Sequence, residues 1–266
     1  MIIKKLKDKL LEKRYRVILV MAFILLMGVA AIISRKSEME LRSLPFSPGD
    51  FKEIALTFDD GPDPNVTPRI LDVLNKEGVK ATFFVVGKMV EKYPSLLKEI
   101  WGEGHDVGNH TYSHPDLTRL SKKDVLEELD KTRILIKKIT GKDTYLFRPP
   151  GGRYDNKVIV TTTLTGYKMI LWTDYPGDYG CPSSKLIYER AVSRAEEEGI
   201  ILLHNGLDST LDALPGIISE LKKRGYGFVT ISELMEEIRE KESIYFEKFE
   251  REQKVSPSPL EMAVPE

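Results

Sequence analysis

From Phe51 onward, short runs rich in β-branched and aromatic residues alternate with amphipathic helical stretches, and this alternation constrains the fold more than any other feature. The predicted strands are Ile54–Phe58, Ala81–Val86, His105–Gly108, Tyr145–Arg148, Lys168–Leu171, Ile200–Leu203 and Gly227–Val229. The predicted helices are Thr67–Glu77, Pro94–Gly102, Lys122–Thr140, Asp155–Thr165, Lys185–Glu198, Leu211–Arg224 and Ile231–Lys241. Such alternation implies a parallel sheet, and seven or eight units over about 190 residues favour a (β/α) barrel. An open doubly wound sheet is the alternative, but no Gly-rich phosphate loop supports a nucleotide cofactor.

The composition narrows the possible functions. The chain of 266 residues has 41% apolar and 30% charged residues and a formal net charge of −1, which gives no indication of nucleic-acid binding. Cys181 is the only cysteine, so an internal disulfide and a cysteine-based zinc cluster are excluded. Histidine chemistry is confined to His105, His110, His114 and His204. His105 lies inside a predicted strand, so we interpret it as structural.

The amino-terminal segment has the pattern of a membrane anchor. Residues 1–16 are strongly basic, and residues 17–33 form an uncharged apolar run. Seventeen helical residues at about 1.5 Å each span roughly 26 Å, near the lower limit for a bilayer. The basic flank predicts a cytoplasmic amino terminus and an extracytoplasmic remainder. A cleaved signal peptide is the alternative, because Gly28, Ala30 and Ala31 offer small residues near its end.

The remaining boundaries follow from composition and capping residues. Residues 34–50 are polar, contain Pro45 and Pro48, and are predicted to be a tether. The catalytic domain is predicted over residues 51–241. Within it, Ser121 can cap the longest helix and Gly141 can end it. Residues 242–266 are charged and end in a proline-containing stretch, which predicts a disordered tail.

Polar clusters follow five of the predicted strands. They are Asp59-Asp60, Asn109–His114, Arg148–Tyr154, Trp172–Tyr179 and His204-Asn205. In parallel βα architectures, functional groups gather where strands end at their carboxyl sides. One such cluster can be an ordinary loop, but five on one rim predict an active site there.

Two of these clusters together indicate a metal site. His110 and His114 are spaced i, i+4, and within a helical turn this spacing puts both imidazoles on one side. The pair alone is a weak signal. Two histidines with a nearby carboxylate and an open position are typical of a catalytic zinc-type site. Asp59 and Asp60 are adjacent, and neighbours on a strand point to opposite faces, so the pair itself requires an explanation.

The chain resembles the polysaccharide deacetylases, which carry the NodB-homology domain of carbohydrate esterase family 4, over about Lys52 to Ser232. The resemblance rests on T-F-D-D-G-P (Thr57–Pro62), H-T-Y-S-H (His110–His114), R-P-P-G-G (Arg148–Gly152), the segment ending in Asp178, and I-L-L-H-N (Ile201–Asn205). It implies a distorted (β/α) barrel that removes acetyl groups from N-acetylated sugars at one divalent metal ion. Zn²⁺ is the expected ion, and Co²⁺, Ni²⁺ or Fe²⁺ also suit the donors.

The resemblance also implies a role for each motif residue. Asp60, His110 and His114 would hold the metal. Asp59 would be the general base and His204 the general acid, with Arg148 holding Asp59 and Asp178 holding His204. The backbone N–H of Gly151 would bind the oxyanion. Trp172, Tyr179 and Leu202 are expected to contact substrate. Gly151 and Tyr179 replace residues that are often aromatic and Trp, respectively, which affects substrate shape and not the reaction.

Three functions fit these motifs to different degrees. The first is a membrane-anchored deacetylase acting outside the cytoplasmic membrane on N-acetylglucosamine or N-acetylmuramic acid units, with a monomeric catalytic domain. The second is an O-acetyl esterase of xylan type using the same site. The third is a non-catalytic glycan-binding module, which is disfavoured because every proposed catalytic position is filled.

Overall fold

The computed structural model describes residues 52–255, which lie in the second of the two units into which the chain divides, Phe51–Glu266. The strands are β1 (Lys52–Asp59), β2 (Thr82–Val85), β3 (Asp106–Asn109), β4 (Leu146–Phe147), β5 (Lys168–Met169), β6 (Gly199–His204) and β7 (Tyr226–Val229). The helices are α2 (Thr67–Glu77), α3 (Gly87–Lys92), α4 (Pro94–Gly102), α5 (Lys122–Thr140), α6 (Asn156–Leu164), α7 (Ser184–Arg194), α8 (Asp208–Lys223) and α9 (Ile231–Val255). Two 3₁₀ turns, Leu117–Arg119 and Pro150–Gly152, complete the elements.

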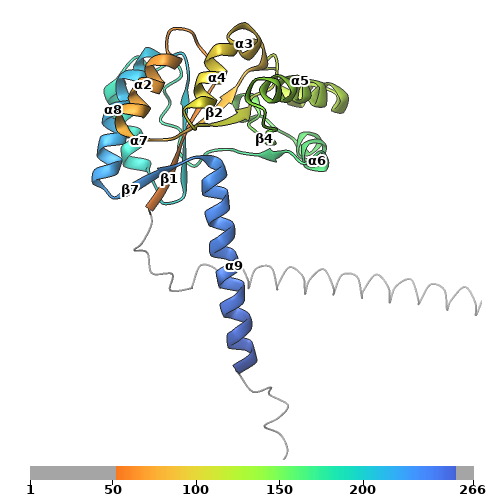
Figure 1. Cartoon of the computed structure of the whole chain (residues 1–266), viewed down its shortest axis with the longest axis vertical. Coiled ribbons are helices and arrows are strands. Elements are labelled where there is room, and N and C mark those ends of the chain that lie inside the picture. The colour runs from red at the N-terminus through yellow and green to blue at the C-terminus, as the bar shows by residue number, and fades with distance from the viewer. Residues whose placement is uncertain (1–51, 256–266) are drawn as a thin grey trace, which may run out of the picture. The chain divides into compact units, whose positions relative to one another are not determined.

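All pairings in the sheet are parallel, in the order β5-β4-β3-β2-β1-β6, and β7 pairs with the first half of β1. The segment after β5 also reaches the opposite edge, because Asp174 bridges to Ile201 of β6. The sheet therefore curls back on itself, and the predicted parallel α/β fold is confirmed as a curled, barrel-like sheet of seven strands. Helices α2, α7 and α8 pack together on one flank, and α3, α4 and α5 on another (Figure 1).

Alternation along the strands separates two environments. Ile54, Leu56 and Phe58 of β1 belong to the main core beneath the helices, where they are fully buried. The residues between them face the inside of the curled sheet. There, Ala55 lies in a small apolar cluster with Phe84 and Ile170, while Thr57 and Asp59 follow toward the carboxyl end. The interior is thus apolar at one end and polar at the other.

The first turn of α9 seals the amino end of the sheet. Thr230 and Glu233 form a reciprocal capping box, with Thr230 N–H donating to Glu233 Oε2 (2.8 Å) and Glu233 N–H to Thr230 Oγ1 (3.3 Å). Ile231 and Leu234 are buried in the apolar interior cluster. The helix then continues to Val255.

This continuation corrects the prediction of a disordered tail over residues 242–266, because the first part of that segment is helical. Residues 242–255 are rich in Glu, Lys, Arg and Gln, which have high intrinsic helix propensity. Residues 256–266 lie outside the described part.

The structure differs from the predicted elements in several other ways. The helix predicted to Glu198 ends at Arg194, because three consecutive glutamates are unfavourable at the negative end of a helix dipole. Helix α3, whose first residue is Gly87, was not predicted. Strands β4 and β5 are shorter than predicted. Ser121 and Gly141 do cap α5 at its two ends, as predicted.

The structure describes no membrane-spanning helix over residues 52–255. The predicted basic segment, span and tether fall on residues 1–50, outside the described part.

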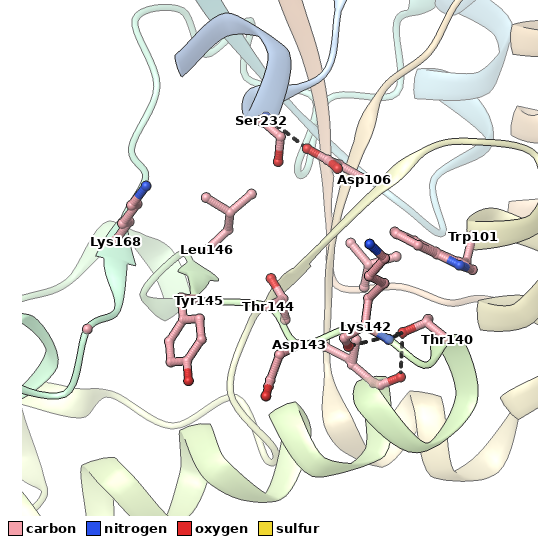
Figure 2. Close-up of a pocket in the computed structure, with 13 residues that line it drawn as sticks. Trp101, Asp106, Thr140, Lys142, Asp143, Thr144, Tyr145, Leu146, Lys168 and Ser232 are labelled. Atoms are coloured by element: carbon pink, nitrogen blue, oxygen red, sulfur yellow. Dashed lines mark hydrogen bonds between the residues drawn. The ribbon is translucent and has the colours of Figure 1, made fainter. Parts of the chain in front are cut away.

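A hollow of about 380 Å³ lies among the amino ends of β3, β4 and β5 and the start of α9 (Figure 2). Asp106 on its wall accepts a hydrogen bond from Ser232 N–H (2.8 Å). Asp143 pairs with Arg133 and Lys137 (2.8 and 2.7 Å). Since none of the predicted site residues lines it, the hollow is separate from the strand-end site.

Candidate active site

Asp59 and Asp60 point in different directions because the chain leaves β1 between them. Asp59 is the last residue of the strand and is 3% exposed. Asp60 has a left-handed backbone, with φ of 74°, which is uncommon for a residue other than glycine. This turn brings its carboxylate to the two histidines of the loop after β3. The structure thus explains how adjacent residues of one strand end can serve one site.

Asp60, His110 and His114 form a compact group. Asp60 Oδ1 lies 3.5 Å from His110 Nε2 and 3.2 Å from His114 Nε2. One ligand atom from each residue lies within 4.8 Å of the others. Burial alone would raise the pKa of Asp60, but the contacts with both imidazoles outweigh it and lower the pKa of this carboxyl. The same contact raises the pKa of His114, while burial opposes the change.

The two histidines are brought together by a loop and not by a helical turn, which corrects the geometry assumed from their spacing. Thr111 and His114 both have positive φ, 67° and 59°. Glu128 of α5 holds the loop between them by accepting hydrogen bonds from Tyr112 N–H (3.0 Å), Ser113 N–H (2.7 Å) and Ser113 Oγ (2.8 Å).

The donor set fits a divalent metal ion. His110 Nδ1 lies 2.8 Å from the carbonyl oxygen of Arg148. A carbonyl only accepts, so Nδ1 carries the proton and Nε2 keeps its lone pair when the ring is neutral. Nε2 is the atom that faces Asp60. Two imidazole nitrogens and one carboxylate oxygen are the ligands that zinc and similar ions bind.

Arg148 is fully buried and holds Asp59. Its Nη1 donates to Asp59 Oδ1 and to Thr57 Oγ1, both at 2.8 Å. Its Nε and Nη2 donate to the carbonyls of Ile170 (3.1 Å) and Leu171 (2.9 Å). The guanidinium also stacks over Phe84, 4.2 Å from the ring centre. These contacts fix the charge of Arg148 beside Asp59 and leave Asp59 Oδ2 directed toward His110, 3.7 Å away.

His204 ends β6 as the register partner of Asp59 on the adjacent strand. The ring Nδ1 of His204 contacts Asp178 Oδ1 at 2.8 Å, and the backbone N–H of His204 donates to Asp178 Oδ2 at 2.7 Å. Thr210 Oγ1 donates to the same oxygen at 2.7 Å. Burial alone would lower the pKa of His204, but Asp178 and the more distant Asp59 and Asp60 raise it. The predicted Asp178–His204 pair therefore exists.

The residues expected to contact substrate surround these groups. The Tyr179 ring is 66% exposed and lies 5.3 Å from the His204 ring. Trp172 packs against Gly152 so closely that a Cβ added to this glycine would lie 2.5 Å from the Trp172 ring. The same ring lies 5.7 Å from the Arg148 guanidinium. Leu202 is buried and pairs with Thr57, on the face that carries Asp59 and His204.

Gly151 lies in the 3₁₀ turn after Arg148, with φ of 59°, a conformation that favours glycine. An added Cβ would meet only the Arg153 side chain, at 3.6 Å. The contacts described here do not connect Gly151 to the paired side chains, so its oxyanion role stays a prediction.

His105, interpreted as structural, has a structural position, and so do Asp63 and Asp155. His105 is buried, accepts a hydrogen bond from Ala81 N–H at 3.2 Å and packs edge-on against Phe83. Burial lowers its pKa to about 4. Asp63 and Asp155 accept backbone hydrogen bonds within a turn and at the start of α6.

Comparison with known proteins agrees with this geometry. The polysaccharide deacetylase family model matches residues 47–170. A peptidoglycan-N-acetylglucosamine deacetylase of Bacillus cereus is 41% identical over 194 residues, 71% of this chain and 90% of that protein. The peptidoglycan-N-acetylmuramic acid deacetylase PdaA of Bacillus subtilis is 39% identical over 188 residues, 69% of this chain and 72% of that protein. The structure of peptidoglycan deacetylase PdaC from Bacillus subtilis superposes with a TM-score of 0.70 at 39% identity, over 75% of this chain and 97% of that one.

The chain belongs to the polysaccharide deacetylase family. The two curated relatives described above are deacetylases of peptidoglycan, one named for N-acetylglucosamine and the other for N-acetylmuramic acid.

Proposed function

We propose that this protein is a metal-dependent deacetylase that removes acetyl groups from N-acetylated sugars of peptidoglycan. The observation that carries the proposal is the meeting of two charged pairs, one buried and one partly buried, beside the Asp60–His110–His114 group. One pair is Arg148–Asp59 and the other is Asp178–His204. Because Asp59 and His204 end neighbouring strands in register, a base and an acid face the same small space.

The residues divide the reaction between them. Asp60, His110 and His114 would hold the ion, which when bound activates water near neutral pH and polarises the acetamide carbonyl. Arg148 holds Asp59 in place through the hydrogen bond to its Oδ1 (2.8 Å), and Asp59 can accept the proton of the attacking water. As the C–N bond breaks, His204 donates its proton to the departing sugar nitrogen. The products are acetate and a free amino sugar.

The raised pKa of His204 suits this role, because a general acid must still carry its proton at the working pH. Tyr179 beside His204 and Trp172 beside Arg148 provide aromatic surface on which a sugar ring can stack. Leu202 supplies apolar surface on the same face of the sheet for the acetyl methyl group.

The location remains part of the proposal. The basic segment 1–16 and apolar run 17–33 support a single-pass anchor with the catalytic domain outside the cytoplasmic membrane. A domain held there would lie next to the cell wall, which contains the substrates of its homologues.

Mass spectrometry of peptidoglycan fragments after incubation with the full chain tests the substrate. We expect loss of acetyl groups from one sugar type, N-acetylglucosamine or N-acetylmuramic acid, and release of the same amount of acetate. Acetate release only from acetylated xylan would favour the O-acetyl esterase. Glycan binding without acetate release from any glycan would favour the non-catalytic module.

A further inference from the structure

The segment that carries Asp178 is tethered at successive points. At its start, the carbonyls of Ile170 and Leu171 accept hydrogen bonds from Arg148. Next, Asp174 pairs with β6: its N–H donates to Ile200 O (3.1 Å) and its carbonyl accepts from Leu202 N–H (2.9 Å). After Asp174 the chain leaves the sheet, four residues before Asp178.

Two arginines of α7 meet the chain where it leaves the sheet. Arg194 Nη1 donates to the carbonyl of Tyr175 at 3.1 Å, and Arg190 Nη1 donates to the carbonyl of Pro176 at 3.2 Å. Arg190 and Arg194 are spaced i, i+4, so they project from the same side of the helix. Gly177, with φ of 75°, follows at once, and an added Cβ there would lie 3.1 Å from Arg190 Nη1.

A buried carboxylate adds to this contact. The Asp174 side chain is only 2% exposed, and neither of its oxygens has a hydrogen-bond partner within the described residues. The guanidinium of Arg194 lies 3.8 Å from Asp174 Oδ1. Burial raises the pKa of Asp174 to about 6, although Arg194 opposes the shift. Arg194 therefore faces both a buried carboxylate and a backbone carbonyl of the same segment.

The segment beyond these contacts supplies several parts of the site. Asp178 receives three hydrogen bonds from His204 and Thr210. The rings of Tyr175 and Tyr179 lie 5.9 and 5.3 Å from the His204 ring. Displacement of residues 175–177 would move Asp178 and the two tyrosine rings relative to His204.

We propose that Arg190 and Arg194 form a clamp that positions Asp178, and through it His204, for the reaction proposed above. They are positioning residues, because neither contacts His204 or the metal-ligand group in the structure described here. The hydrogen bond of Arg194 alone contributes little, since its side chain is 55% exposed. The pair acts by fixing two successive carbonyls, so the double variant should be affected more than either single one.

The test compares the full chain with Arg190→Ala, Arg194→Ala and the double variant. Lys185→Ala is the matched control, because Lys185 lies on the same helix with its side chain 83% exposed. Circular dichroism and metal content establish that each variant is folded and retains its metal site. The readouts are the titration of His204 followed by NMR, and kcat and KM for acetate release.

We expect the double variant to bind metal normally while the pKa of His204 moves down toward its ordinary value. We also expect kcat to fall about tenfold, since small misplacements of catalytic groups are costly. Arg194→Lys should lose less activity than Arg194→Ala, because it keeps a cation near Asp174. An unchanged His204 titration in a folded double variant would overturn the clamp.

The clamp can be tested even if the proposed function is wrong or the double variant does not fold. If no glycan releases acetate, the NMR titration still tests the clamp by itself. If the double variant does not fold, each single variant must shift the titration in the same direction, and a wild-type titration in both would overturn the proposal.

Discussion

Asp59 and Asp60 show how a change of backbone conformation at one residue divides two adjacent carboxylates between two tasks. Asp59 keeps the strand geometry and meets Arg148, while the left-handed Asp60 meets His110 and His114. The motif predicted that both carboxylates belong to the site. The positive φ that separates them was not predictable, because it is uncommon outside glycine and the motif does not indicate which aspartate adopts it.

Replacing Asp59 separates these two tasks. In Asp59→Asn, we expect turnover to fall by about 10²–10⁴, because the general base is lost. Metal content should stay at the wild-type level, since Asp60, His110 and His114 remain. Metal analysis and acetate release on the same sample check this. A folded variant without metal would show that the two aspartates have been assigned the wrong way round.

The pH dependence of the reaction should depend on Asp178. Asp178 raises the pKa of His204, so its removal lowers that pKa and the proton is lost at lower pH. In Asp178→Asn, the alkaline limb of the kcat profile should therefore move to lower pH, and kcat should fall about tenfold or more. A profile with an unmoved alkaline limb would contradict the role of His204 as the acid.

Helix α5 shows what element-level patterns predict and what they miss. Its caps, Ser121 and Gly141, follow from the sequence and are present. The role of Glu128 could not be predicted from the sequence, because Glu128 is one glutamate among several charged residues of an amphipathic helix. Only the folded chain shows that it lies beside the loop between His110 and His114. Arg190 and Arg194 of α7 were missed for the same reason.

Weakening the contact between Glu128 and the loop that joins His110 and His114 should weaken metal binding. In Glu128→Gln, the acceptor charge that holds Tyr112 N–H and Ser113 N–H is lost, and we expect about tenfold lower metal affinity. Glu127→Gln is the control, because Glu127 faces Lys123 on the exposed side of the same helix. Competition with a chromogenic chelator measures both affinities. Equal losses in the two variants would point to a general charge effect.

At the scale of the whole molecule, the sheet determines where the chemistry lies. Alternating strands and helices predicted a parallel sheet with polar groups at its carboxyl end, and both features are present. The return contact between Asp174 and Ile201 was not predictable, because it joins a strand to an irregular segment. The same contact brings the segment that carries Asp178 beside β6 and thus to His204.

The anchor proposal makes a prediction for the full chain. We expect the full chain to sediment with membranes and to be released by detergent, because residues 17–33 are uncharged and apolar. A chain starting at residue 37 should remain soluble and active. Recovery of the full-length, uncleaved chain in the soluble fraction would contradict the anchor, and a shortened secreted form would indicate signal-peptide cleavage.

The metal dependence of the proposed deacetylase can be tested by following bound metal and released acetate in one experiment. Metal-free protein would be titrated with Zn²⁺ in the presence of peptidoglycan fragments, with Asp60→Ala as the matched variant. We expect acetate release to rise with metal content, to saturate at one ion per chain and to be absent in Asp60→Ala, which should not retain the ion. Full acetate release by the metal-free protein, or by Asp60→Ala without metal, would contradict this metal dependence.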